Sequence, residues 1–193
     1  MRNFSVTLLL ITLVFFGVSL TSATDLETEY LMAVADYYEV SYEMAYDIYA
    51  IGVEIEDVAV TLSVAGKAGA DPRNVAATRV KGKSWQSICK KNELGAADFY
   101  VMINRQFVSK TFSPIFDKFK NTDPKNWNEI NLSDSDYCNL INLKFVYSHY
   151  DYSVFHVMAM RDYQKTYPKI SNKIFAVREA ETKKALASAN NNK

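Results

Sequence analysis

Apolar residues recur every three or four positions along most of the chain, which is the spacing of one face of an α-helix. The clearest stretch is 57–91, where Val58, Leu62 and Ala65 form one stripe that ends before Gly69. A glycine ends a helix well because it adopts left-handed backbone angles without a steric cost. Helix-ending and helix-starting residues of this kind divide the stretch into three short helices. The same pattern elsewhere in the chain predicts an all-α fold.

Residues that favour helix N-termini mark where the helices are expected to begin. Asp71 stands before Pro72, Ser41 and Ser84 each precede an apolar-periodic segment, and Ser133 begins a capping-box sequence. Their side-chain oxygens accept the unpaired N–H groups of a first helical turn. In addition to the three helices within 57–91, the pattern predicts helices at 26–38, 42–51, 115–120, 134–148, 154–164 and 170–187.

The helical pattern also recurs along the chain, which predicts a repeat. Shifting 57–91 forward by 82 residues aligns it without a gap on 139–173, with seven identities that include Arg79 on Arg161. Helix-pair repeats of this kind pack on their neighbours. The alternative to a true repeat is the limited similarity that any set of short amphipathic helices shows. The expected units lie near 27–55, 57–91, 92–105 and 136–173, with a less regular connection over 106–132.

The first 23 residues have the features of a signal peptide. Arg2 supplies a positive charge, 6–20 is apolar, and Thr-Ser-Ala at 21–23 is a small-residue cleavage site. The apolar run is shorter than the roughly 20 residues needed to span a bilayer, and no later segment qualifies. We therefore expect a secreted or periplasmic protein with no membrane span after signal removal. One helical domain is expected at 24–187, followed by a disordered tail at 188–193.

Charge is balanced over the whole chain but divided unevenly along it. The sequence has 22 Lys and Arg against 22 Asp and Glu, yet residues 24–66 hold ten acidic residues and no basic one. An acidic face could therefore meet a basic one within the chain or across a dimer. Alternatively, the acidic and the basic residues could form two separate solvent-exposed surfaces, which would account for the same charge distribution. Because duplex binding depends on phosphate neutralisation, the overall neutrality argues against a nucleic-acid partner.

The two cysteines, Cys89 and Cys138, allow two interpretations. In an exported protein they could form a disulfide that closes a long loop. Each also lies on an apolar helical face, where a free cysteine behaves as a small hydrophobic residue. The sequence alone leaves both possibilities open.

No set of residues has the spacing of a catalytic, metal or cofactor site. His149 and His156, with Asp151 between them, lack further ligands at metal-binding spacing. A possible binding patch for a glycan or a polyanion comes instead from interleaved aromatic and basic residues. Its aromatic rings could equally fix a long loop to the core. The patch consists of Phe107, Lys110, Phe112, Phe116, Lys118, Phe119 and Trp127.

Residues 84–105, SWQSICKKNELGAADFYVMINR, resemble a DNA-binding helix-turn-helix unit in pattern. The recurring sequence pattern of Gly, then Ser-Trp-x-x-Ile, then Leu-Gly resembles that of small exported bacterial proteins with repeated helix-turn-helix-like units and no established function. The expected function is that of an exported helical protein acting by surface contacts on a protein partner or an envelope glycan, with self-association possible. The alternatives are an envelope glycan-binding or glycan-processing protein and, ranked lower, a nucleic-acid binder.

Overall fold

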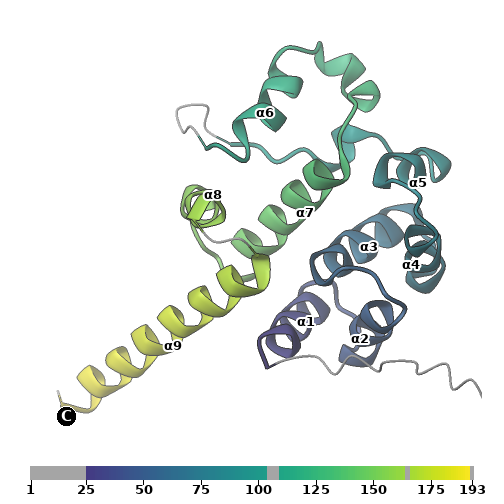
Figure 1. Cartoon of the computed structure of the whole chain (residues 1–193). Coiled ribbons are helices and arrows are strands. Elements are labelled where there is room, and N and C mark those ends of the chain that lie inside the picture. Colours follow the sequence, from purple (N-terminus) through teal and green to yellow (C-terminus); the bar gives the residue numbers. More distant parts are fainter. Residues whose placement is uncertain (1–24, 104–108, 164–165, 192–193) are drawn as a thin grey trace, which may run out of the picture.

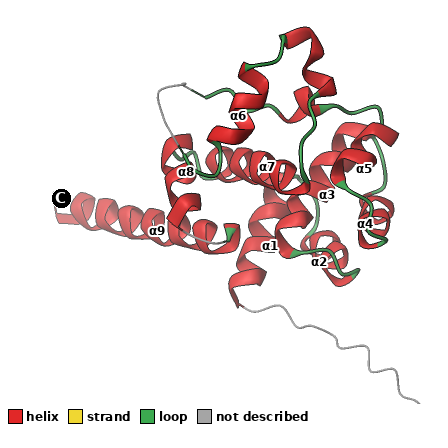
Figure 2. Cartoon of the chain, turned by 45° about the horizontal axis from the view of Figure 1, so that its top comes forward, coloured by secondary structure: helices red, strands yellow, loops and turns green. Residues whose placement is uncertain are grey.

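The computed structural model describes residues 25–103, 109–163 and 166–191, and every regular element in these ranges is helical (Figure 2). This confirms the predicted all-α class for the described part of the chain. The α-helices are α1 (Asp25–Tyr37), α2 (Tyr42–Ala50), α3 (Ile55–Ala68), α4 (Pro72–Val80), α5 (Trp85–Lys91), α6 (Ser113–Lys120), α7 (Asp134–His149), α8 (Val154–Tyr163) and α9 (Tyr167–Asn191). Two 3₁₀ helices, η1 (Ala96–Phe99) and η2 (Pro124–Glu129), complete the set.

The N-caps expected from the sequence are present at four helix starts. Ser41, Asp71 and Ser84 each accept a backbone N–H from the first turn of α2, α4 and α5. Ser133 does the same for α7, where it forms a full capping box with Asp136. These local hydrogen bonds satisfy N–H groups that have no partner within the helix, so they fix where each helix begins.

Helix α9 is longer at both ends than the expected 170–187. Pro168 lies in its first turn, where a residue without an N–H loses no hydrogen bond, so the proline starts the helix rather than interrupting it. At the other end α9 continues through Asn191, into residues expected to form the tail. Figure 1 shows its second half extending away from the other helices.

Helices α3 and α7 pack against each other at the centre of the fold and share its most extensive helix contact (Figure 1). Both are buried around much of their circumference, with Val58 and Leu62 of α3 and Leu140 and Phe145 of α7 in the core. Helices α1, α2 and α4 surround α3, whereas α8, α5 and η1 contact α7. A helix that is apolar on several faces must be enclosed by neighbours in this way.

A cluster centred on Arg79 connects α4 and α5 to the central pair. Its Nε donates to Asp57 Oδ2 at 2.9 Å, and another guanidinium nitrogen lies 2.5 Å from Asp134 Oδ2. The Trp85 ring nitrogen donates to Asp57 Oδ1 at 3.0 Å, and the Trp85 backbone N–H donates to Asp134 Oδ1 at 2.7 Å. One arginine and one tryptophan thus join α3, α4, α5 and the start of α7.

A second cluster, centred on Arg161, connects α8 and α9 to the same central pair. Its Nε donates to Asn139 Oδ1 at 3.0 Å, and the guanidinium pairs with Glu56 at 3.2 Å. The Tyr167 backbone N–H donates to Glu56 Oε1 at 2.6 Å, while the guanidinium carbon lies 4.5 Å from the Tyr167 ring centre. Hydrogen bonds to charged groups inside a protein are stronger than those between neutral groups.

Four helix-to-helix turns among the described residues have the same backbone form. Glu39, Gly69 and Asp151, which follow α1, α3 and α7, all have positive φ values of 54°, 62° and 45°. The next helix begins three residues later in each case, at residues 42, 72 and 154. Glu93, which follows α5, forms the fourth of these turns, with a φ of 59° and the next helix at residue 96. The rest of the expected partial unit at 92–105 differs, because 96–99 is a 3₁₀ helix and 100–103 has no regular structure. Residues 104 and 105 lie outside the described residues.

The connection over 106–132 contains two short helices rather than the single one expected. Phe112, Ile115 and Phe119, at the start of α6 and within it, are all buried and belong to the hydrophobic core of the body. Asp162 of α8 holds the start of this region, since its carboxylate accepts the backbone N–H groups of Lys110 and Thr111 at 3.0 Å. The region is therefore fixed to the body by hydrogen bonds as well as by its rings.

Candidate functional site: a pocket with two lysines

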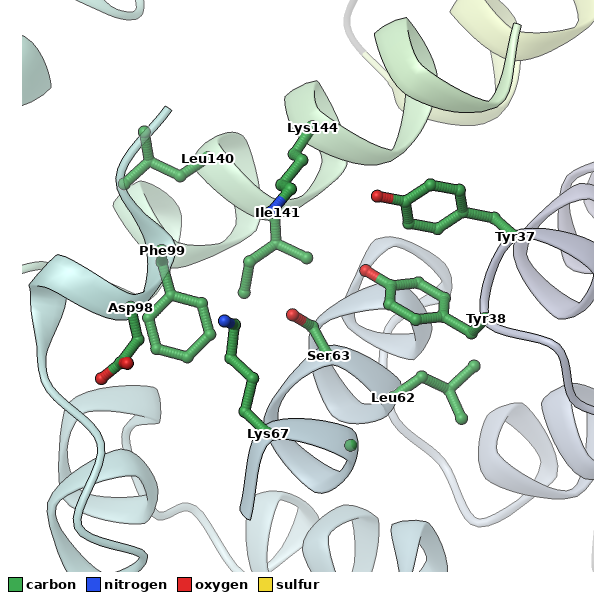
Figure 3. Close-up of a pocket in the computed structure, with 11 residues that line it drawn as sticks. Tyr37, Tyr38, Leu62, Ser63, Lys67, Asp98, Phe99, Leu140, Ile141 and Lys144 are labelled. Atoms are coloured by element: carbon green, nitrogen blue, oxygen red, sulfur yellow. The ribbon is translucent and has the colours of Figure 1, made fainter. Parts of the chain in front are cut away.

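A pocket of about 230 Å³ opens where the end of α1, the middle of α3, α7 and η1 meet (Figure 3). We call it the two-lysine pocket. Its volume is below the roughly 300–1,000 Å³ typical of sites for drug-sized ligands, so it suits a small group. The lining residues are Tyr37, Tyr38, Leu62, Ser63, Gly66, Lys67, Asp98, Phe99, Leu140, Ile141 and Lys144.

Helical spacing explains how α3 and α7 both supply apolar and basic side chains to the pocket. On α3, Leu62 and Ser63 lie one turn before Gly66 and Lys67, so all four share one side of the helix. On α7, Lys144 follows Leu140 by four residues and therefore lies directly beyond it. Buried leucines thus form the floor, and the lysine one turn further on reaches the mouth.

The end of α1 provides the aromatic wall. Tyr37 and Tyr38 pack edge to face with ring centres 4.8 Å apart, and the Tyr37 ring also contacts Phe145 of α7 at 5.3 Å. Burial raises the pKa of Tyr38, although its hydrogen bond with Ser63 acts in the opposite direction. Burial also raises the pKa of Tyr37. Both hydroxyls therefore stay protonated at neutral pH and can donate hydrogen bonds.

The opposite wall comes from η1, whose position depends on a glycine. A Cβ atom at Gly95 would lie 2.7 Å from the Asn128 backbone of η2, so only glycine allows the two 3₁₀ helices to approach so closely. The Gly95 N–H donates to Asp98 Oδ2 at 2.8 Å and fixes that carboxylate. Phe99 follows and points its ring into the pocket (Figure 3).

The lysines supply the charge. Lys67 Nζ lies 5.7 Å from the centre of the Phe99 ring, a cation–π contact. In Figure 3 the Lys67 ammonium lies beside the Phe99 ring and Lys144 points toward the centre of the pocket, while the hydroxyls of Tyr37 and Tyr38 face them from the other side and the Asp98 carboxylate is turned away. Neither lysine forms an ion pair among the described residues. The pocket thus gathers cationic and hydroxyl donors above an apolar floor, an arrangement suited to binding an anion.

The disulfide considered from the sequence is absent, because Cys89 and Cys138 are both free. Cys89 hydrogen-bonds with Tyr137 of α7. Cys138, the next residue on α7, projects about 100° further around the helix, and its thiol lies 3.5 Å from Glu56 of α3. The two sulfurs therefore face different neighbours. Of the two interpretations of the sequence, the structure supports the one with two unpaired thiols.

The aromatic and basic residues predicted as a binding patch lie in several environments. Phe112 and Phe119 are fully buried, so their rings do not face solvent. The Trp127 ring nitrogen donates to the Phe119 carbonyl at 3.1 Å, and Lys118 pairs with Asp136 at 2.7 Å. Lys110 is exposed, Phe116 is half-buried, and Phe107 lies outside the described residues.

A DNA-reading helix-turn-helix unit would need Arg79, Lys81 and Lys83 on one exposed helical stripe. Arg79 is held between Asp57 and Asp134, whereas Lys81 and Lys83 are exposed. The three residues therefore do not form one exposed basic stripe.

Sequence reasoning found only part of the two-lysine pocket. Tyr37 and Tyr38 stand in a tyrosine-rich stretch of the sequence, and Lys144 falls at an outer helical position within an apolar run. The sequence pattern did not single out Lys67 or Phe99. The available signal was a lysine four residues after a buried leucine or serine on each central helix, but that spacing is common on any amphipathic helix.

Comparison of the chain with protein-family models, curated proteins and solved structures gives no significant match. Within the described residues, no helix combines the length and apolar character needed to cross a membrane. The function must therefore be argued from the geometry itself.

Proposed function

We propose that this is an exported helical protein that acts by surface contacts, and that the two-lysine pocket is where it holds its partner. The observation that carries the proposal is the convergence of Lys67, Lys144 and two tyrosine hydroxyls on one small apolar hollow. Unpaired cations at the mouth of a concave site favour binding of an oppositely charged group. The role is binding rather than the transformation of a substrate.

The proposed export rests on the N-terminal sequence, which lies outside the described residues. A positive residue, an apolar run and a small-residue cleavage site together are typical of a secretory signal peptide. Export would place the pocket in a secreted or periplasmic environment, where the partner would be another exported protein or a glycan of the envelope. The pocket favours the protein partner, because its floor is apolar whereas sugars are rich in hydroxyls.

We also infer that the segments near 27–55, 57–91 and 136–173 are copies of one unit, with 24–187 as a single domain. The support lies in the left-handed turns at Glu39, Gly69 and Asp151, which fall at matching positions of the three segments; the same turn at Glu93 falls outside that register. The clusters of Arg79 and Arg161 add a second correspondence, because each arginine stacks on an aromatic residue six positions later. Stacked copies would explain how short helices can enclose a continuous core.

Site-specific photo-cross-linking in the native cells tests the proposed contact. A benzophenone amino acid would replace Lys144 at the pocket mouth, which leaves Lys67 to bind the partner's charge. As the matched control it would replace Lys110, an exposed lysine outside the pocket. We expect a discrete cross-linked species from position 144 and at least tenfold less of it from position 110.

A second substitution shows whether cross-linking of the partner depends on the pocket. Gly66 lines the pocket within α3, and a Cβ atom there meets nothing within 4 Å, so the backbone accepts a side chain at this position and Gly66→Leu adds bulk to the pocket wall. Cross-linking from position 144 should then fall about tenfold. The proposal would be refuted if the partner cross-linked equally from positions 144 and 110. It would also be refuted if Gly66→Leu left cross-linking from position 144 unchanged. Capture from position 110 alone would favour the patch around α6.

A further inference from the structure

We infer that the two-lysine pocket binds a monocarboxylate carried on a small apolar body, such as the C-terminal residue of a peptide or a free carboxylic acid of similar size. This inference rests on the proposed function in placing the ligand in that pocket. It does not require the ligand to belong to a protein.

The charges of the lining residues favour a monoanion. Lys67 and Lys144 contribute two positive charges and Asp98 one negative charge, which leaves a net charge of +1. Two separate ammonium groups, each with three donors, suit the two oxygens of a carboxylate. No arginine lines the pocket, so the planar fork that favours bidentate phosphate binding is missing from this site.

The hydroxyls of Tyr37 and Tyr38 add directional donors to the same anion when Ser148 and Ser63 are the donors in the hydrogen bonds that these hydroxyls already make. Both hydroxyls keep their protons, because burial raises the pKa of Tyr37 and Tyr38. Figure 3 shows the hydroxyls on the side of the pocket opposite Phe99, facing the lysines. A carboxylate at the mouth would thus meet ammonium groups and neutral O–H donors, whose hydrogen bonds to a charged acceptor are stronger than those to a neutral one.

The floor and walls favour an apolar body behind the carboxylate. Leu62, Leu140 and Ile141 are buried and form the base, and Phe99 closes one side. The volume of about 230 Å³ limits the ligand to roughly the size of one amino-acid residue. A branched aliphatic or an aromatic side chain attached to a carboxylate fits these conditions. A neutral sugar would leave the lysines without a counter-charge.

Isothermal titration with a matched acid and amide tests this ligand class on the folded protein. The probes are N-acetyl-leucine and N-acetyl-leucinamide, which share the side chain and differ in charge. For a ligand of about ten non-hydrogen atoms we expect a dissociation constant of about 0.1–1 mM for the acid, and binding of the amide at least tenfold weaker. Equal binding of acid and amide, or binding of neither, would overturn the inference.

Three variants assign the binding to the pocket. Lys67→Gln and Lys144→Gln should each weaken binding of the acid about five- to tenfold, whereas Lys110→Gln should leave it unchanged. Gly66→Leu should abolish binding, while thermal unfolding followed by circular dichroism should show that the variant folds at least as stably as the wild type. Unchanged affinity in Gly66→Leu would overturn the location of the site.

Two further probes separate the sources of the carboxylate. A tripeptide acetyl-Ala-Ala-Leu that binds more tightly than 4-methylpentanoate would point to a protein C-terminus, and the reverse order would point to a free acid. Both outcomes support the ligand class. If cross-linking from position 144 captures a partner but no carboxylate binds, the ligand class fails and the proposed contact stands. If carboxylates bind but no partner is captured, the proposed partner contact fails instead.

Discussion

At the residue scale, buried charges are each matched to more than one partner. Glu56 receives the Arg161 guanidinium and the Tyr167 backbone N–H, and Asp57 receives both Arg79 and the Trp85 ring nitrogen. A buried ion is costly unless its hydrogen-bonding capacity is filled. Every buried side-chain nitrogen and oxygen among the described residues has a hydrogen-bond partner.

Removing one member of the Arg161 pair should therefore be strongly destabilising. The side chains of Arg161 and Glu56 are 15% and 16% exposed, whereas Arg73 and Asp47 form a pair that is 47% and 48% exposed. We expect Arg161→Met to lower the free energy of unfolding by about 3–5 kcal/mol, because it leaves Glu56 buried without its counter-charge.

Arg73→Met provides the matched control, since an exposed pair contributes only about 0–1 kcal/mol. Urea unfolding followed by circular dichroism measures both variants. Similar losses in the two variants would mean that the Glu56 cluster is open to water and that burial does not decide its strength.

At the scale of elements, the turns between successive helices determine how each pair folds back. One residue in each turn after α1, α3 and α7 is left-handed, namely Glu39, Gly69 and Asp151, and only Gly69 among these three is a glycine. A side chain in this conformation costs about 1–2 kcal/mol per residue, whereas glycine adopts it freely. Glu39 and Asp151 therefore hold an unfavourable backbone conformation that packing of the helices maintains.

Introducing a glycine at one of these turns and removing the glycine from another should change stability in opposite directions. Glu39→Gly should raise the free energy of unfolding by about 0.5–1 kcal/mol, and Gly69→Ala should lower it by about 1 kcal/mol. No atom lies within 4 Å of a Cβ placed at Gly69, so only the backbone accounts for the loss.

Gly66→Ala is the control within the same helix, because Gly66 has ordinary helical angles and equal open space. It should stabilise α3 by roughly 1 kcal/mol through helix propensity. Thermal or urea unfolding measures the three variants. A loss in Glu39→Gly would show that its side chain makes a contact worth more than the backbone cost.

At the scale of the whole molecule, part of the uneven charge of the sequence is matched within the chain. Acidic residues before position 66 pair with basic residues after it, as Asp47 does with Arg73 and Glu56 with Arg161. The packing of α5 and α7 likewise decides the chemistry of the thiols. Burial raises the pKa of Cys89 to about 12, and burial with nearby Glu56 raises that of Cys138.

Both cysteines should therefore be unreactive in the folded protein and free once it unfolds. With Ellman's reagent at pH 8 we expect close to no fast-reacting thiol in the native state, because the thiolate is the reactive form. In guanidinium without reductant, two thiols per chain should react, as in a control that is reduced first. Thiols that appear only after reduction would show that Cys89 and Cys138 are oxidised in the isolated protein.

The fold was predictable from the sequence where local interactions decide it. Ser41, Asp71, Ser84 and Ser133 act on N–H groups only two or three residues away, so their caps can be read directly from the sequence. Helix ends were less certain, as Pro168 shows, because a proline can either begin or interrupt a helix. The local pattern also gave no warning that 96–99 would form a 3₁₀ helix.

The sequence by itself determined the helical class, most helix starts and the features of an export signal, because each depends on residues within one or two turns. Only the tertiary structure decided that Lys67 and Lys144 flank one pocket, that Cys89 and Cys138 stay apart, and that Glu56 neutralises Arg161. These relations join helices up to about a hundred positions apart in the chain. Long-range contacts depend on how α3 and α7 pack, and no local pattern records that packing.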